Sequence, residues 1–138
     1  MTRYGIIGSG MMGQEHIRNI HLLSDASVSA YFEPDDGMAA ATDALIPGAA
    51  RCPDLGGMLR RNDVDALGIA SPNHCHMGQL REIAGTRPLP VLVEKPVYTA
   101  ASDEADLAEL AKHYPAPIWV AMEYRYMPPV AKFREMVD

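Results

Sequence analysis

The sequence predicts an α/β fold, a doubly wound parallel sheet with strand order 3-2-1-4-5-6, and two observations lead to this prediction. Short runs rich in Ile, Val and Leu alternate with longer segments of helical period, as strands and helices do around a parallel sheet. A glycine-rich turn also joins the first run directly to the first helical segment. With 138 residues, of which 48% are hydrophobic and 22% charged, the chain has the length and composition of one globular domain.

The apolar runs are expected to be strands covered on both faces, because none of them alternates cleanly between apolar and polar residues. Five runs are main strands, and a weaker strand is expected near Ala50–Cys52. In chain order the main strands are Tyr4–Ile7, Val28–Phe32, Ala66–Ala70, Val91–Val93 and Ile118–Met122.

The segments between the runs are expected to be helices. In the first of them, Ile17 and Ile20 fall on a stripe that would pack on the sheet. Asp54 and Ser102 stand where an N-cap is needed, and Gly85 stands where a helix would end. The expected helices are Met12–Leu23, Pro34–Ala44, Asp54–Arg61, His76–Ala84, Ser102–His113 and Val130–Val137.

Charge and cysteine content exclude several classes of protein. The formal net charge of −6 argues against a nucleic-acid or anionic-membrane partner. No apolar run approaches the roughly 20 residues of a membrane span. Cys52 and Cys75 form neither a CxxC pair nor a disulfide framework, which suits a reducing compartment, so a cytoplasmic protein is expected.

A GxGxxG motif, Gly8-Ser9-Gly10-Met11-Met12-Gly13, follows the first strand and opens the first helix. Gly8 permits a tight turn, Gly10 lets the backbone approach a pyrophosphate, and Gly13 allows close packing of helix on strand. The helix N-terminus then offers N–H groups and partial positive charge to the phosphates. The motif predicts a dinucleotide-binding Rossmann domain, and a glycine-rich turn without a cofactor is the alternative.

Glu33 stands at the end of the second strand, 20 residues beyond Gly13. A carboxylate there accepts hydrogen bonds from the adenosine-ribose hydroxyls and repels the 2′-phosphate of NADP, so NAD is the expected cofactor and NADP is disfavoured. Pro34, Asp35 and Asp36 follow, so no Arg or Lys stands where a 2′-phosphate is usually held. The alternative is an exposed acid in a turn.

The segment Ser71-Pro72-Asn73-His74-Cys75-His76 follows the main strand Ala66–Ala70, at the edge where a cofactor crevice would lie. Its polar groups could line the nicotinamide half of the crevice. No metal site is expected, because consecutive side chains diverge and no further ligand set is visible. In the alternative interpretation Asn73 caps the next helix and the histidines are exposed to solvent.

Glu94-Lys95-Pro96 ends the next strand, again at the carboxyl edge. A lysine beside a nicotinamide can hydrogen-bond a substrate hydroxyl and stabilise the alkoxide character that develops as hydride leaves. An ordinary surface lysine is the alternative, and the isomer of the Lys95–Pro96 bond stays open.

Taken together, these residues resemble the Gfo/Idh/MocA family of oxidoreductases, named for glucose-fructose oxidoreductase and inositol dehydrogenase. The resemblance implies a dehydrogenase or oxidoreductase that uses NAD(P) and acts on a sugar, a polyol, inositol or a related hydroxyl compound. The motifs that carry it, in the family's order, are Gly5–Gly13 with His16, Asp63–Ala66 leading into Ile69–His76, Glu94–Pro96, and Tyr124–Pro128.

The resemblance also implies roles for individual residues. Lys95 would be the catalytic lysine, and Arg125 would lie where the chain leaves the cofactor domain. The expected cofactor-binding residues are Gly8, Ser9, Gly10, Met11, Met12, Gly13, Glu33, Ser71, Pro72, Asn73, His76, Glu94, Lys95 and Arg125.

Family members continue beyond this length into a second α/β domain that holds most substrate contacts and the usual oligomer interface. Residues 1–122 are therefore expected to be the NAD(P)-binding domain, and residues 123–138 the start of the crossover into a C-terminal domain. The 138 residues alone should bind dinucleotide with little or no turnover, expose apolar surface around Trp119–Met127, and self-associate, whereas the parent protein would be a homo-oligomer. A non-catalytic NAD(H)-binding sensor or regulatory module is the alternative function.

Overall fold

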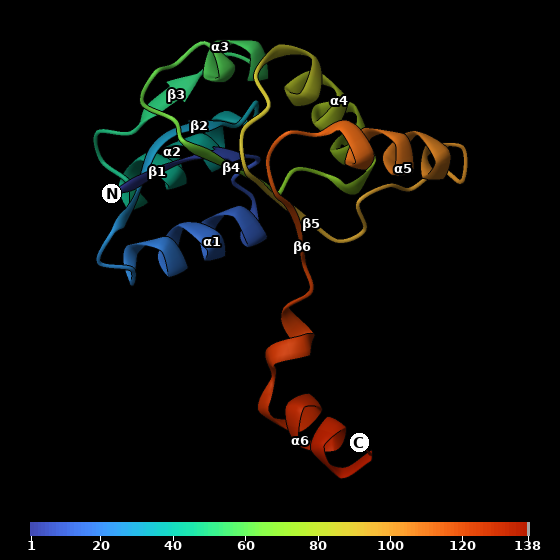
Figure 1. Ribbon diagram of the computed structural model, residues 1–138. Coiled ribbons are helices and arrows are strands. Elements are labelled where there is room, and N and C mark those ends of the chain that lie inside the picture. The colour runs from blue at the N-terminus through green and yellow to red at the C-terminus, as the bar shows by residue number, and fades with distance from the viewer. Residues whose placement is uncertain (138) are drawn as a thin grey trace.

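A six-stranded, all-parallel sheet with the order β3-β2-β1-β4-β5-β6 forms the centre of the computed structural model, which describes residues 1–137 (Figure 1). Asp138 lies outside the described residues. The predicted fold class and strand order are confirmed. The strands are β1 (Thr2–Ile7), β2 (Ala26–Phe32), β3 (Ala50–Cys52), β4 (Ala66–Ile69), β5 (Val91–Glu94) and β6 (Ile118–Ala121).

Six α-helices and two short 3₁₀ turns connect and follow the strands in the described part of the chain. Each expected helix is present, with ends that shift by up to a few residues. The helices are α1 (Met11–His21), α2 (Asp36–Leu45), α3 (Leu55–Leu59), α4 (His76–Thr86), α5 (Asp103–His113) and α6 (Pro128–Val137), and the 3₁₀ turns are η1 (Asn73–Cys75) and η2 (Glu123–Tyr126).

The expected helix ends are confirmed in one case and wrong in two. The Asp54 side chain caps α3 by accepting a hydrogen bond from the Gly57 amide at 2.5 Å. Gly85 does not end α4, because the packing of Leu80 and Ile83 in the core outweighs a helix-propensity cost of about 1 kcal/mol. Ser102 makes no side-chain capping bond, since its backbone is already helical.

Helices cover the sheet on both faces, and each face has its own apolar core. On one face, α3 and α4 bury Met58, Leu80 and Ile83 against β4 and β5. On the other face, α1 and α2 bury Ile17 and Ala39 against β1 and β2. The two layers separate above β1 and β4, which is where a doubly wound sheet opens a crevice at the carboxyl ends of its strands.

The β6 strand is less covered than expected, so the prediction that every strand is covered on both faces is wrong there. Trp119 is 56% exposed. On the face that carries α1, a hollow of about 510 Å³ lies over β4, β5 and β6, lined by Ala66, Leu92 and Trp119 among others. The reason is that α1 and α2 cover only the half of this face over β1 and β2.

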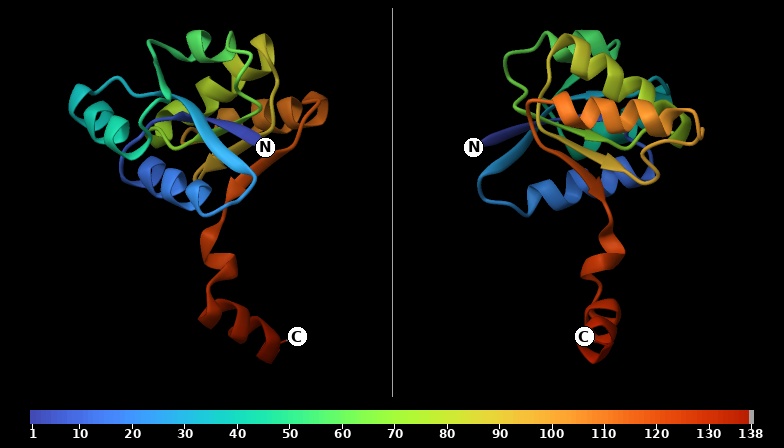
Figure 2. Two further views of the ribbon diagram at one scale, coloured as in Figure 1. Left: turned by 90° about the vertical axis from the view of Figure 1, so that its left-hand side faces the viewer. Right: turned by 45° about the vertical axis from the view of Figure 1, so that its right-hand side comes forward.

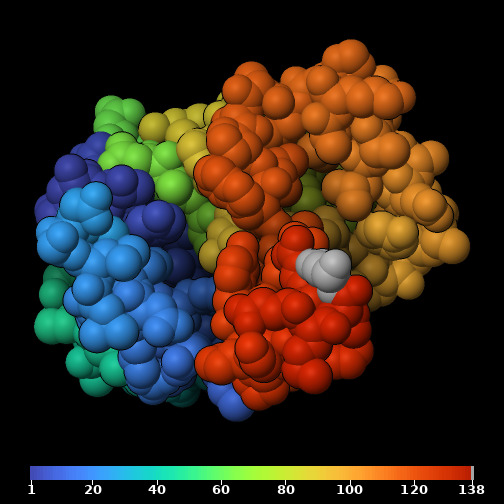
Figure 3. All heavy atoms as spheres, turned by 60° about the horizontal axis from the view of Figure 1, so that its bottom comes forward, coloured from blue at the N-terminus to red at the C-terminus, as the bar shows by residue number. Residues whose placement is uncertain are grey.

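The segment after β6 stands away from the sheet (Figures 1 and 2) and lies at the front when the molecule is seen from that end (Figure 3). The predicted exposure of apolar side chains on this segment is confirmed, and self-association of the chain stays a prediction. The exposed apolar residues from β6 onward are Trp119, Val120, Met122, Tyr124, Tyr126, Met127, Val130, Phe133, Met136 and Val137.

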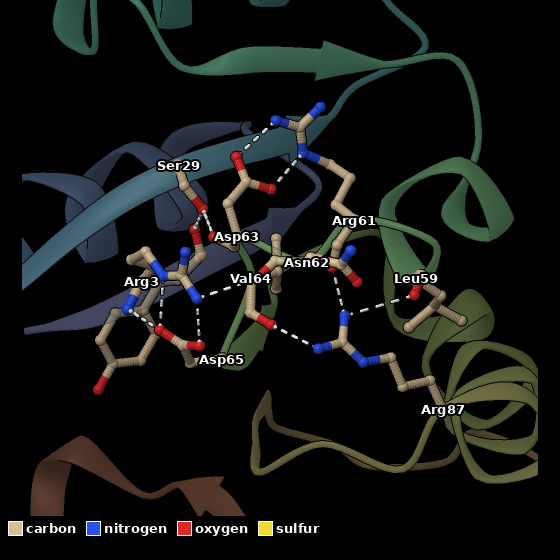
Figure 4. Close-up of polar contacts among 10 residues, drawn as sticks. Arg3, Ser29, Leu59, Arg61, Asn62, Asp63, Val64, Asp65 and Arg87 are labelled. Carbon is tan, nitrogen blue, oxygen red and sulfur yellow. Dashed lines mark hydrogen bonds and ion pairs between the residues drawn. The ribbon is translucent and has the colours of Figure 1, made fainter.

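Three arginines hold the loop between α3 and β4, at the end of the sheet opposite the crevice (Figure 4). Arg3 forms a two-pronged ion pair with Asp65, with N–O distances of 2.8 and 2.7 Å, and thereby holds the pKa of that carboxyl well below its usual range. Arg61 pairs in the same way with Asp63. Arg87 donates to the main-chain oxygens of Leu59, Arg61 and Val64, so its one guanidinium closes the end of α3 and the loop that follows.

Replacing Arg87 by Ala is expected to lower the free energy of unfolding by about 2 kcal/mol, because three carbonyl groups lose a charged donor. Arg87→Lys should recover less than half of that loss, since a single ammonium cannot span the carbonyl groups that the guanidinium fork reaches. Urea unfolding measures both. Arg60→Ala is the control, because Arg60 forms only an exposed ion pair and its loss should change stability by less than about 0.5 kcal/mol.

Candidate functional site

The turn between β1 and α1 brings three pieces of backbone into close contact. Gly8 has φ +83°, and a Cβ on it would lie 2.5 Å from the Cα of Ser71 in the loop after β4. A Cβ on Gly13 would lie 2.1 Å from the carbonyl oxygen of Gly8. No side chain fits at either position, so the expected tight turn and close packing of helix on strand are confirmed. The Thr42 hydroxyl also donates to the Ser9 hydroxyl at 2.7 Å and ties α2 to the turn.

Gly10 differs from the other two glycines because the space around it is open. A Cβ there would meet only the sulfur of Met38, at 3.9 Å. Gly10 is the N-cap of α1 and provides no side-chain capping bond, so the first N–H groups of the helix face the crevice without a side-chain acceptor. A helix N-terminus of this kind suits an anionic group.

Glu33 is 7% exposed and belongs to the wall of the crevice, so the alternative of an exposed turn acid is wrong. One carboxylate oxygen accepts the Ser9 amide at 2.8 Å, and the other accepts the Asp35 amide at 3.0 Å. These amides fix the carboxylate at the end of β2. Oε2 also accepts a long hydrogen bond from the Ser9 hydroxyl at 3.4 Å, so the open acceptor capacity for a ligand hydroxyl is mainly on Oε1.

The glycine turn, the end of β2 and the loop after β4 enclose a cleft of about 540 Å³. It is the size of a pocket for a small molecule or cofactor half. The lining residues are Gly8, Gly10, Met11, Met12, Phe32, Glu33, Pro34, Met38, Ala70, Ser71, Pro72, Cys75 and Gln79. A long anionic ligand with hydroxyl groups fits this donor set, with its charge at Gly10 and its hydroxyls at Glu33.

His76 lies in a place that the sequence did not indicate. The residue is fully buried, and its two ring nitrogens lie 2.8 Å from the carbonyl oxygens of Ser71 and Pro96. It therefore joins the loops that follow β4 and β5, and both ring nitrogens are engaged by main-chain oxygens, whereas its predicted place beside the nicotinamide stays a prediction. Asn73 and His74 are exposed, and Asn73 provides no capping bond to α4.

Lys95 lies at the carboxyl end of β5 and is 42% exposed, as a lysine that meets a ligand must be. Its ammonium is 3.3 Å from a carboxylate oxygen of Glu123 and 5.9 Å from the ring centre of Tyr124. The Glu123 carboxylate raises the pKa of Lys95 above its ordinary value. A second hollow of about 670 Å³ opens here, and its lining includes Lys95, Glu123, Tyr124, Arg125 and Arg134.

The buried Glu94 carboxylate contacts both the backbone of Lys95 and the side chain of His16. It is 5% exposed, its Oε1 lies 2.8 Å from His16 Nε2, and its Oε2 accepts the Lys95 amide at 3.3 Å. Because His16 belongs to α1, this contact links the helix of the glycine turn to the strand that ends in Lys95. The Lys95–Pro96 bond is cis.

The structure divides the predicted site residues into three groups. Gly8, Gly10, Met11, Met12, Glu33, Ser71 and Pro72 line the first cleft, and Lys95 and Arg125 line the second hollow. Ser9, Gly13, Asn73, His76 and Glu94 line neither of them. The cofactor contacts of all these residues stay predictions.

Three residues of the site were not predicted from the sequence. Gln79 lines the first cleft one helical turn after His76 and lies 2.6 Å from the Ser71 hydroxyl. Arg51 and Glu123 reach Glu33 and Lys95 from separate elements. The helical spacing of Gln79 could have indicated it, whereas the other two contacts depend on strand pairing and on the path of the chain after β6.

The described residues offer neither a metal site nor a membrane-spanning helix. No group of three or more His, Cys, Asp or Glu side chains there could hold a metal ion. No described helix is long and apolar enough to cross a membrane.

The sequence profile of the oxidoreductase family with an NAD-binding Rossmann fold, Gfo/Idh/MocA, matches residues 2–122. The chain belongs to this family. The "Rhizopine catabolism protein MocA" of Rhizobium meliloti is 30% identical over 138 residues, which cover 98% of this chain and 42% of that protein. An inositol 2-dehydrogenase of Leifsonia xyli subsp. xyli is 35% identical over 141 residues, covering 98% of this chain and 40% of that protein.

A solved dehydrogenase structure has the same fold. The myo-inositol dehydrogenase of Lactobacillus casei, in complex with NAD(H) and myo-inositol, superposes with a TM-score of 0.89 at 25% identity and covers 100% of this chain and 41% of that one. The chain thus spans about 40% of the length of the relatives it matches.

Replacing Glu123 by Gln is expected to lower the pKa of Lys95, because the carboxylate that stabilises the ammonium is removed. The measurement is an NMR titration of ¹³C-dimethylated lysines, with Lys95 assigned through Lys95→Arg. The chain has only Lys95, Lys112 and Lys132, so the other two are internal controls whose signals should not respond. A Lys95 titration that is the same in both proteins would contradict the ion pair.

Proposed function

We propose that this chain is the cofactor-binding part of an NAD-dependent oxidoreductase that acts on the CH–OH group of a sugar, polyol, inositol or related hydroxyl compound. The observation that carries the proposal is the placement of an anion-binding glycine turn, the Glu33 carboxylate and Lys95 at the ends of three strands of one sheet. The named activities of the relatives, several of them inositol 2-dehydrogenases, support the substrate class.

The cofactor would lie across the carboxyl ends of β1 and β4. The N-terminus of α1 at Gly10 would receive the pyrophosphate, and Glu33 would accept the adenosine-ribose hydroxyls. Ser71 and Pro72 would border the nicotinamide half. NAD supplies, when bound, an acceptor for hydride from a carbinol carbon.

Lys95 would act on the substrate oxygen. In the direction of reduction its ammonium, which Glu123 stabilises, would donate a proton to the carbonyl oxygen as the carbon gains hydride; in the direction of oxidation the neutral amine would accept the hydroxyl proton as hydride leaves. Glu94 and His16 fix the backbone from which the lysine side chain projects. Residues 123–138 would begin the crossover to a second domain that completes the substrate pocket around Lys95, as the length of the relatives suggests.

Binding of the cofactor is tested by calorimetric titration of the 138-residue chain with NAD and NADH. Gly10→Val is expected to weaken binding at least tenfold, about 1.4 kcal/mol, because its side chain would enter the cleft. Folding should survive, since the space around Gly10 is open. Gly78→Val, at a helix position with nothing within 4 Å of the added Cβ, is the matched control and should bind NAD normally. Binding that is insensitive to Gly10→Val would place the cofactor elsewhere.

The role of Lys95 is tested in a protein that joins this chain to a substrate domain. Lys95→Met is expected to lower kcat roughly 10²- to 10⁴-fold, as loss of a group that acts on a substrate proton does, and to change the dissociation constant of NAD by much less than kcat. Lys112→Met, on the exposed surface of α5, is the control. Full activity of Lys95→Met would contradict the proposed mechanism, and NAD binding without any turnover would favour a non-catalytic sensor or regulatory module.

A further inference from the structure

The end of the cleft beside Glu33 carries an arginine from another strand. Arg51 lies on β3 and pairs in register with Tyr31 of β2. Its Nη2 donates to the main-chain oxygen of Glu33 at 2.9 Å and to Oδ1 of Asp36 at 2.8 Å. A hollow of about 460 Å³ lined by Glu33, Pro34 and Arg51, among others, adjoins the cleft here. The guanidinium therefore contacts the main chain of Glu33, the residue whose carboxylate would hold the adenosine ribose.

Arg51 is the only basic residue among the described residues that line the cleft or this adjoining hollow. A guanidinium is well suited to a phosphate, because its planar N–H groups can bind two oxygens at once. The 2′-phosphate is the group that distinguishes NADP from NAD, and it would stand at the ribose edge that Glu33 faces. The fold thus places Arg51, a side chain suited to phosphate, close to Glu33, whose carboxylate would repel phosphate.

Asp36 keeps this arginine engaged. It stands in the first turn of α2, where the helix dipole stabilises its charge, and its side chain is 91% exposed. Its carboxylate accepts a hydrogen bond from Arg51 and adds negative charge to the segment that contains Glu33 and Asp35. The charge of Arg51 is consequently balanced by a carboxylate that is itself open to solvent.

We propose that Asp36, acting through Arg51, is a specificity-determining residue of the cofactor site. Together with Glu33 it excludes a 2′-phosphate, and without these two acids Arg51 accepts one. The inference rests on the proposed function, because it requires the adenosine ribose to lie at Glu33. It differs from the sequence-based expectation, which attributed selectivity to Glu33 and found no basic residue after it.

The test measures dissociation constants of NAD and NADP for the 138-residue chain. Glu33→Ser clears the ribose edge and provides the common background, to which Asp36→Asn, Arg51→Gln or both are added. Asp25→Asn in the same background is the charge-matched control, since Asp25 is exposed at the amino end of β2, away from the cleft. Because Glu33 accepts two backbone amides, the series is repeated with Glu33→Gln, and urea unfolding confirms that each variant is folded.

Adding Asp36→Asn to the Glu33→Ser background is expected to tighten NADP binding at least tenfold and to leave NAD binding nearly unchanged. Further addition of Arg51→Gln should abolish the gain, and Asp25→Asn should produce none. A gain that persists without Arg51, a gain of the same size from Asp25→Asn, or no gain from Asp36→Asn would each overturn the proposal.

The outcome is separable from that of the proposed function. If the unchanged chain binds neither NAD nor NADH, the proposed function fails before any variant is considered. If it binds NAD and Gly10→Val prevents this, the cofactor site stands, and the NADP series alone decides the role of Asp36 and Arg51.

Discussion

The rest of the structure depends on one steric constraint, the close approach of β1, α1 and the loop after β4. Gly8 touches the backbone at Ser71, and Gly13 touches the carbonyl of Gly8, so closely that neither position has room for a Cβ. This contact sets the direction in which α1 leaves the sheet. It points the helix N-terminus at Gly10 into the cleft, and it brings Ser71 from β4 to the opposite wall. The orientation of the α1 N-terminus toward the cleft thus follows from the close packing of the backbone at Gly8 and Gly13.

Charge is distributed in two ways across the sheet. At the amino ends of the strands, Arg3, Arg61 and Arg87 are paired with carboxylates or carbonyl oxygens, and these contacts stabilise the loop between α3 and β4 (Figure 4). At the carboxyl ends, Glu33 accepts two main-chain amides and lines the first cleft. Lys95 pairs with Glu123 and lines the second hollow. Both side chains are fixed in place by protein contacts and still have hydrogen-bonding capacity with which to bind a ligand.

The buried Glu94 connects the elements that line the two cavities. Its carboxylate lies against His16 of α1 and accepts the amide of Lys95, so the element that begins with the glycine turn also supports the lysine. A shift of α1 would therefore act on both ends of the site. His76 has a comparable function between the loops after β4 and β5.

The sequence by itself determined the strands and the glycine turn, because hydrophobic period and glycine spacing are local properties of the chain, and the strand order followed from the Rossmann fold that this turn indicates. It also identified Glu33 and Lys95, which follow directly after their strands. Tertiary structure alone decided the contacts between distant elements: Arg51 reaches Glu33 through the pairing of β3 with β2, and Glu123 reaches Lys95 after the chain has left β6. It also decided that His76 is buried and that β6 is open on one face. The physical reason is that such contacts join residues 18 or more positions apart in the sequence. The local hydrophobic pattern predicts each strand but not which side chains of other elements will contact it.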